Sequence, residues 1–274
     1  MNHLKPDFII VGAMKGGTST LAYFLDKQNN IVMAPGEINY FDNDKNFKKG
    51  QNWYLRQFKS KEYNKIWGEK TATYHYHEMV PKRIYDYNPE IKLLWILRNP
   101  IKRAYSNYWH RVKYGLEFDT FEKAIQKELN GLQEDIWGLY LKRSNYIDQI
   151  KAFNRYFNND QMHFIVFEHL VNDIEKNLKN VLKYLGSDNQ DIIVPEKKAK
   201  NETYLPSSPK VLKTSNKIFG QTVPFKIIRK VLERKSPGYP NLSEATENKL
   251  QAYFRKSILE LEQFTNLNLS SWKK

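Results

Sequence analysis

The amino-acid sequence predicts an α/β fold, a three-layer arrangement in which helices flank a central parallel sheet. Short stretches of apolar and β-branched residues alternate along the chain with amphipathic stretches. This is the pattern of parallel strands joined by crossover helices. The first apolar stretch also runs directly into a glycine-rich loop that an amphipathic segment follows. A strand, a glycine loop and a helix in this order are typical of phosphate-binding α/β folds.

Three strands are predicted, and each precedes a predicted helix. The strands are expected at residues 8–13, 91–98 and 162–170, which are apolar and rich in β-branched or aromatic residues. The helices are expected at residues 18–28, 101–115 and 172–186, the last ending at Gly186. Residues 119–157 are also expected to be largely helical. A last helix is predicted at residues 243–266, with an apolar side formed by Leu250, Phe254, Ile258, Leu261 and Phe264.

Residues 195–240 differ in composition from the rest of the chain, because they hold six of the eleven prolines and many lysines. We do not expect this stretch to be regular core, and it could form either a mobile basic lid or a surface connection. No second domain is indicated. Residues 1–274 are therefore predicted to form a single domain that contains this segment.

Charge and composition narrow the function class. The 274 residues include 44 Lys and Arg against 30 Asp and Glu, a formal net charge of +14. That excess fits either general solubility or an anionic ligand or substrate. Cysteine is absent, which excludes disulfides and thiolate chemistry and fits a reducing compartment. Since no membrane span, targeting segment, metal-ligand cluster or nucleic-acid motif is visible, we expect a soluble cytoplasmic protein without a bound metal.

The stretch VGAMKGGTST, residues 11–20, has the properties of a phosphate-binding loop in a P-loop-like fold. Gly16 and Gly17 allow a close approach of an anion to the backbone. Thr18, Ser19 and Thr20 supply amides and hydroxyls at the start of the next helix, where the partial positive charge of the helix also favours an anion.

This loop departs from the magnesium-nucleotide loop G-x-x-x-x-G-K-[ST]. Gly12 and Gly17 have the spacing of that motif, but Thr18 stands where it has lysine, and Lys15 precedes the glycine pair. No aspartate ends a later apolar stretch as a metal partner. A magnesium-dependent P-loop kinase is therefore the weaker alternative.

Two motifs resemble those of sulfotransferases that use PAPS (3′-phosphoadenosine 5′-phosphosulfate), in particular the heparan sulfate sulfotransferase domain and its bacterial relatives. KGGTST resembles the 5′-phosphosulfate loop of that family. LRNPIKRAYSNYWH, residues 97–110, resembles its 3′-phosphate motif and implies that Arg98 and Ser106 hold the 3′-phosphate. The resemblance implies PAPS as the donor, PAP as the product and a transferase activity.

Two further motifs resemble segments that lie near the acceptor in the same family. PGEINYFDND, residues 35–44, is similar to the segment Lys-Glu-x-x-(Phe/Tyr)-Phe, which implies that Glu37 is the catalytic base. GEKTATYHYH, residues 68–77, is similar to Glu-Lys-(Ser/Thr)-Pro-x-Tyr near the substrate, and Lys70 falls on its lysine. His75 and His77 remain alternatives for the base, because other branches of the superfamily use histidine.

Sulfuryl transfer assigns roles to these residues. Negative charge builds on the bridging oxygen of the donor, where we expect Lys15 to stabilise it. The acceptor hydroxyl loses a proton, which Glu37 can take, and the chemistry requires no metal. Relatives close a basic loop over the nucleotide, so Lys198 and Lys200, with Lys197, are candidate phosphate contacts.

The acceptor and the partners are less defined than the donor. The resemblance implies a carbohydrate or glycan acceptor, with a small-molecule natural product or a lipid as the alternative. A basic nucleic-acid-binding protein is the non-enzymatic alternative, although no such motif supports it. The choice between a hydroxyl and an amine as acceptor group, and the oligomeric state, stay open.

Overall fold

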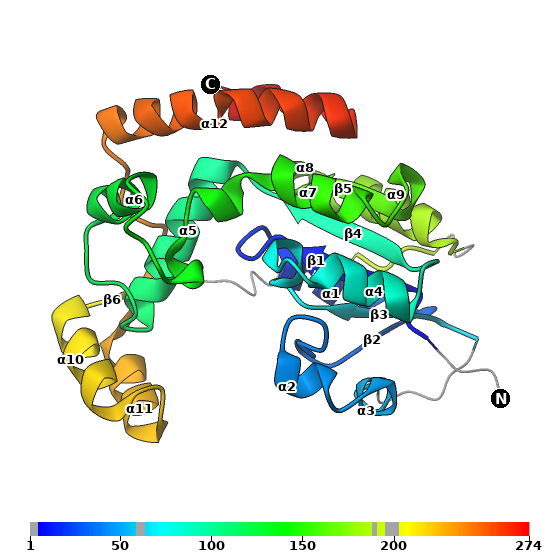
Figure 1. Cartoon of the computed structure of the whole chain (residues 1–274), viewed down its shortest axis with the longest axis horizontal. Helices are drawn as coiled ribbons and strands as arrows, with labels where there is room; N and C mark the ends of the chain where they lie inside the picture. Colours follow the sequence, from blue (N-terminus) through cyan, green and yellow to red (C-terminus); the bar gives the residue numbers. More distant parts are fainter. Residues whose placement is uncertain (1–4, 59–63, 188–190, 195–202, 274) are drawn as a thin grey trace. The chain divides into compact units, whose positions relative to one another are not determined.

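The structure is a computed structural model that describes residues 5–58, 64–187, 191–194 and 203–273. The chain divides into two compact units (Figure 1). The first unit contains residues 1–98, 146–198 and 260–268, and the second contains residues 99–145, 199–259 and 269–274. Each unit is therefore assembled from three separate stretches of the sequence.

The first unit is built on a five-stranded parallel sheet with the strand order β2-β3-β1-β4-β5. Its strands are β1 (Phe8–Gly12), β2 (Ile31–Met33), β3 (Ile66–Lys70), β4 (Lys92–Leu97) and β5 (Met162–Val166). The central strand β1 is buried along its whole length because both of its edges are paired and both of its faces are covered. The predicted parallel sheet is confirmed.

Two predictions about the strands need correction. The predicted strand at residues 162–170 ends at Val166, because Phe167–Asn172 forms helix α8. The sequence analysis also missed β2 and β3. β2 has only three residues, and β3 includes Gly68, Glu69 and Lys70, whose types are depleted in strands.

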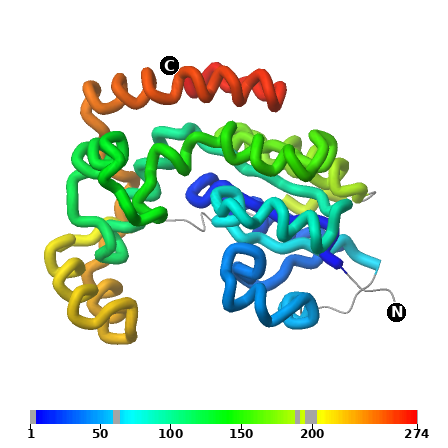
Figure 2. Tube along the Cα trace, in the orientation of Figure 1, coloured from blue at the N-terminus to red at the C-terminus, as the bar shows by residue number. Residues whose placement is uncertain are grey.

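Helices cover both faces of this sheet, which gives the three predicted layers (Figure 2). The side chains of Phe8 and Ile10 pack in a core with those of α1 (Thr18–Leu25), α8 and α9 (Ile174–Leu185). On the opposite face the ring of Trp95 contacts Phe153 of α7 (Tyr146–Asn154), with 4.9 Å between ring centroids. Helix α4 (Val80–Tyr87) packs beside α7.

The first unit also has two short helices and a 3₁₀ turn near the ends of β2 and β3. They are α2 (Asp44–Phe47), α3 (Gln51–Leu55) and the turn Tyr74–Tyr76. Helix α9 stops at Gly186 in the left-handed conformation, as the sequence predicts.

The second unit is mainly helical. Its α-helices and β-strands are α5 (Pro100–Lys113), α6 (Phe121–Leu129), β6 (Thr203–Pro206), α10 (Pro209–Phe219), α11 (Val223–Leu232), β7 (Glu233–Ser236) and most of α12 (Glu244–Thr265). Residues 119–157 are largely helical as expected, and they form two separate helices, α6 and α7. Along α12, Leu250, Phe254, Ile258 and Leu261 are buried as predicted.

Residues 203–236 form regular secondary structure that the composition did not predict, although few of their side chains are buried. β6 and β7 form an antiparallel pair, and α10 and α11 lie between them in the sequence. The prolines are compatible with this arrangement because Pro206 ends a strand, and Pro209 and Pro224 occupy the first turns of helices. At those positions a helix needs no donor from the proline nitrogen.

Candidate active site

The glycine loop connects the carboxyl end of β1 to the first turn of α1 in the first unit. Gly17 has φ 107°, a conformation that residues with a Cβ adopt at a cost. A Cβ on Gly16 would lie 2.6 Å from the carbonyl oxygen of Ile96 in β4. The glycine pair therefore lets the loop turn sharply while it packs directly against the sheet.

The first turn of α1 presents backbone donors. Gly17 caps the helix without a side-chain hydrogen bond. Within the described residues, the amides of Gly17, Thr18 and Ser19 donate to no protein acceptor. Donors of this kind at a helix N-terminus are suited to an anion.

Lys15 has φ 69°, in the left-handed region that a lysine rarely adopts. Strained backbone of this kind concentrates at functional sites. Lys15 directly precedes Gly16 and Gly17, so its ammonium group and the backbone donors of the first turn of α1 belong to one short loop.

Arg98 follows β4 and reaches the same loop. Its Nη1 lies 3.4 Å from the carbonyl oxygen of Lys15, which accepts this long hydrogen bond. Its guanidinium lies 5.3 Å from the centroid of the Phe167 ring. Its Nε is buried without a hydrogen-bond partner among the described residues. The guanidinium thus carries one donor that the described protein does not satisfy.

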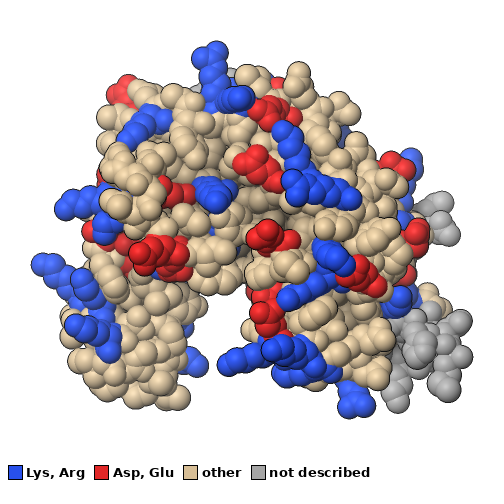
Figure 3. All heavy atoms as spheres, in the orientation of Figure 1, with Lys and Arg blue, Asp and Glu red and all other residues tan. Residues whose placement is uncertain are grey.

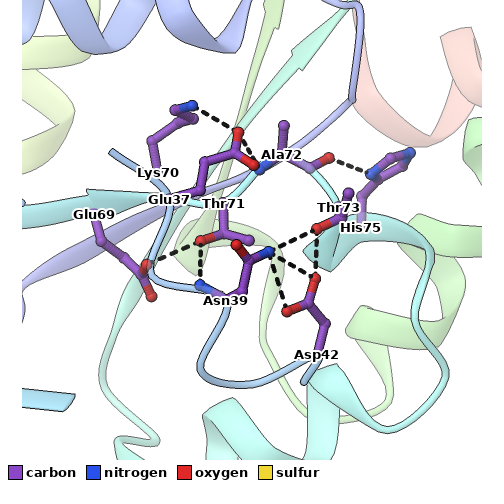
Figure 4. A network of polar contacts seen from close by, with 9 residues as sticks. All are labelled: Glu37, Asn39, Asp42, Glu69, Lys70, Thr71, Ala72, Thr73 and His75. Atoms are coloured by element: carbon purple, nitrogen blue, oxygen red, sulfur yellow. Dashed lines mark hydrogen bonds and ion pairs between the residues drawn. The ribbon is translucent and has the colours of Figure 1, made fainter. Parts of the chain in front are cut away.

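Glu37 and Lys70 meet at the carboxyl end of β3 (Figure 4). Nζ of Lys70 donates to Oε1 of Glu37 at 2.6 Å, and the amide of Ala72 lies 3.5 Å from the same oxygen. Within the described residues, Oε2 of Glu37 accepts no hydrogen bond. The glutamate side chain is 34% exposed and that of the lysine 12%, so the carboxylate is accessible while its ammonium partner is held.

A polar network supports the backbone beside this ion pair (Figure 4). The backbone N–H of Asn39, a residue with φ 51°, donates to Oγ1 of Thr71 at 3.3 Å. Its side chain lies 3.4 Å from both carboxylate oxygens of Asp42. The hydroxyl of Thr73 also donates to Asp42. The segment that carries Glu37 is thereby tied to the segment that follows β3.

Glu69 joins this network from the protein interior through its hydrogen bond with Thr71. Its carboxylate is fully buried, with 2.7 Å between Oε1 and the hydroxyl of Tyr54 and 3.1 Å between Oε2 and the hydroxyl of Thr71. Burial raises the pKa of Glu69 to about 7, although the hydrogen bonds from Tyr54 and Thr71 act in the opposite direction. A buried acid therefore lies next to Lys70 in sequence while its side chain enters the protein interior.

His75, the alternative base, is buried. It is 2% exposed, and its Nδ1 lies 2.9 Å from the carbonyl oxygen of Ala72. A Cβ on Gly12 would lie 2.6 Å from Cβ of His75, so the histidine packs directly against the end of β1. These contacts favour the more accessible Glu37 as the base.

The remaining predicted residues belong to the second unit or fall outside the described residues. Ser106 is on α5 in the second unit, where it is buried and its hydroxyl lies 3.4 Å from that of Tyr239. Because Arg98 belongs to the first unit, their pairing stays a prediction. Lys198 and Lys200 lie outside the described residues.

Sequence reasoning missed the supporting network. Its members lie within the two stretches already singled out, residues 35–44 and 68–77. Period two relates only Glu69 to the residues of β3, because the strand ends at Lys70 and Thr73 lies in a turn with helical backbone angles. Asp42 carried no local signal either.

Comparisons with known proteins agree with the motifs. A family model described as "Sulfotransferase domain" matches residues 5–265. The chain is 34% identical over 186 residues to heparan sulfate glucosamine 3-O-sulfotransferase 5 of Mus musculus, covering 66% of this chain and 53% of that protein. It is 26% identical over 260 residues to 3-O-sulfotransferase 6 of the same species, covering 95% and 72%. The chain thus spans about half the length of the first of these relatives.

A solved structure has the same fold. The crystal structure of a sulfotransferase from Alicyclobacillus acidocaldarius superposes with a TM-score of 0.75 at 21% identity. The superposition covers 99% of this chain and 100% of that one. At this identity the likeness concerns the fold.

Proposed function

Because the chain belongs to the sulfotransferase domain family, we propose that it transfers a sulfuryl group from PAPS to an acceptor hydroxyl or amine. One observation carries the proposal. Lys15, Lys70 and Arg98 lie at or just beyond the carboxyl ends of β1, β3 and β4, which are neighbours in the sheet. Ligands of open parallel sheets bind at this edge, and three cations there suit a donor that carries phosphate and sulfate.

The donor fits the loop chemically. The amides of the first turn of α1 and the Nε of Arg98 are donors without a described protein partner. They are suited to the phosphate groups of PAPS. Lys15 supplies positive charge for the oxygen that bridges phosphorus and sulfur.

In the transfer step, each bond change and the released proton have a group to accept them. The acceptor oxygen forms a bond to sulfur while the bond between sulfur and the bridging oxygen breaks, and that electron pair leaves with PAP. Lys15 stabilises the leaving oxygen. The proton of the acceptor passes to Oε2 of Glu37, while Lys70 holds Oε1.

A carbohydrate is the acceptor class that we propose. The similarity to two heparan sulfate sulfotransferases supports it. A small-molecule natural product or a lipid is the alternative. The described residues form no helix long and apolar enough to cross a membrane, and they contain no cluster of His, Asp and Glu suited to a metal.

Two experiments test the proposal in order. A thermal shift with PAP tests the donor site, and a stabilising shift is expected because PAP binds the folded state alone. A turnover screen with PAPS over carbohydrate, lipid and small-molecule acceptors then tests the acceptor. Magnesium-dependent ATP turnover without a response to PAP would instead support a P-loop kinase.

A further inference from the structure

The hairpin formed by α10 and α11 exposes large apolar side chains. In the described residues, five large apolar side chains are more than 55% exposed, and four of them lie in this hairpin. They are Ile218 at 66%, Val223 at 65%, Ile227 at 59% and Val231 at 77%. Single exposed apolar residues are ordinary on protein surfaces, but a concentration of them marks an interaction surface.

On α11 the exposed residues form one stripe. Val223, Ile227 and Val231 are spaced by four residues, which places them on the same side of the helix. Phe225 points to the other side and is fully buried. The helix therefore already has a packed inner face, and the stripe is a second, outward apolar face.

The inner side of the hairpin is held to the rest of the second unit. Leu212 of α10 is fully buried. The side chain of Asn216 donates to the carbonyl oxygen of Gly115 at 2.9 Å, and that of Gln221 donates to the carbonyl oxygen of Tyr114 at 3.1 Å. The exposed stripe thus belongs to an anchored element.

Positive charge accompanies the stripe. Residues 209–236 contain eight Lys and Arg and one acidic residue, Glu233, so their formal charge is +8 − 1 = +7. Oε1 of Glu233 forms ion pairs with Nζ of Lys113 at 3.1 Å and with Nε of Arg229 at 3.4 Å. Among the described residues, Lys226 and Lys230, which follow the stripe along α11, form no ion pair. In Figure 3 this hairpin, at the lower left, has blue residues along its edge.

We propose that the α10–α11 hairpin docks on the surface of an anionic lipid bilayer. An amphipathic helix with an apolar stripe and neighbouring lysines inserts its apolar side at the level of the headgroups, and its cations attract anionic lipid. A second copy of this chain is disfavoured as the occupant, because two faces of charge +7 would repel each other. A soluble polyanion is disfavoured because it leaves the valine and isoleucine side chains in water.

Vesicle sedimentation tests this proposal with the full chain. Binding is expected to vesicles of phosphatidylcholine and phosphatidylglycerol in equal amounts, and little binding to phosphatidylcholine alone. Added salt should weaken it. Ile227→Asp is expected to weaken the binding about tenfold or more, because it removes a large apolar side chain and adds a negative charge.

Leu132→Asp is the matched control, because Leu132 is 67% exposed but lies outside the hairpin. It should bind vesicles as the unchanged protein does, and both variants should keep the thermal unfolding midpoint. The variant Lys226→Gln/Lys230→Gln should lower binding to the anionic vesicles while the apolar stripe stays intact.

Three outcomes would overturn the proposal. The first is absence of binding to the anionic vesicles, and the second is equal binding by Ile227→Asp and the unchanged protein. The third is self-association in sedimentation velocity that Ile227→Asp abolishes while vesicle binding is absent, which would identify a second copy as the occupant. The test uses no sulfate donor, so it is independent of the proposed activity.

Discussion

The ammonium group of Lys70 lies 2.6 Å from Oε1 of Glu37, and this ion pair joins segments that are 33 residues apart in the sequence. It occupies one carboxylate oxygen and leaves Oε2 for an acceptor proton. The lysine thereby orients the proposed base, and the polar network around Asn39 and Asp42 holds the backbone of both segments.

Glu37→Gln should abolish most turnover and keep nucleotide binding. The amide retains the shape of the side chain but cannot accept the acceptor proton, so turnover should fall about 10²–10⁴-fold. PAPS turnover measures the loss, and a thermal shift with PAP measures binding. Glu175→Gln, at an exposed position on α9, is the control. Near-normal turnover would move the base to His75 or elsewhere.

Lys15→Ala should lower turnover about 10²–10³-fold, because the leaving oxygen loses its stabilising charge. Steady-state kinetics with PAPS measures the effect. Lys27→Ala is the control, since Lys27 is an exposed lysine just beyond α1 whose ammonium lies over the ring of Tyr23. Full activity of Lys15→Ala would contradict the proposed mechanism.

Glu69 should make stability depend on pH. Its pKa is raised from 4.5 to about 7, chiefly by burial, so between these values the folded chain holds a proton that the unfolded chain releases. The contribution of this group is therefore complete below pH 4.5 and lost as the pH rises through about 7.

Glu69→Gln removes this titration. The free energy of unfolding of the variant should decline less between about pH 4.5 and about pH 7, by up to about 3 kcal/mol relative to the unchanged protein. Urea unfolding across this range measures both, and Glu175→Gln should follow the unchanged protein. Parallel curves for Glu69→Gln and the unchanged protein would show that Glu69 does not titrate there.

Gly17→Ala should destabilise the fold by more than Gly131→Ala. Both glycines have positive φ, at 107° and 69°. A Cβ on Gly17 would lie 2.3 Å from the ring of Phe167, whereas nothing lies within 4 Å of one on Gly131. Gly131→Ala should cost about 1–2 kcal/mol through backbone strain, and Gly17→Ala about 1–3 kcal/mol more through overpacking. Equal losses in urea unfolding would mean that Phe167 moves aside.

The features that could be predicted before the fold was known are those with local signals. The apolar runs of β1 and β4, the glycine loop and the helix stop at Gly186 could all be predicted, because strand burial and left-handed turns restrict residue type directly. The same holds for Lys15, Glu37 and Arg98 as candidate residues, since each lies in a recognisable motif at or after a predicted strand or loop.

Which residues contact one another follows from the packing of the whole chain. β3 forms because its short polar strand pairs with β1 and β2 on either side, and these partners are distant in sequence. That pairing places Lys70 against Glu37 and turns Glu69 into the interior beside Tyr54. The prolines of residues 203–236 likewise fit strand ends and first helical turns only once those elements are packed. Strand order depends on long-range contacts, and a local pattern of residue types does not encode it.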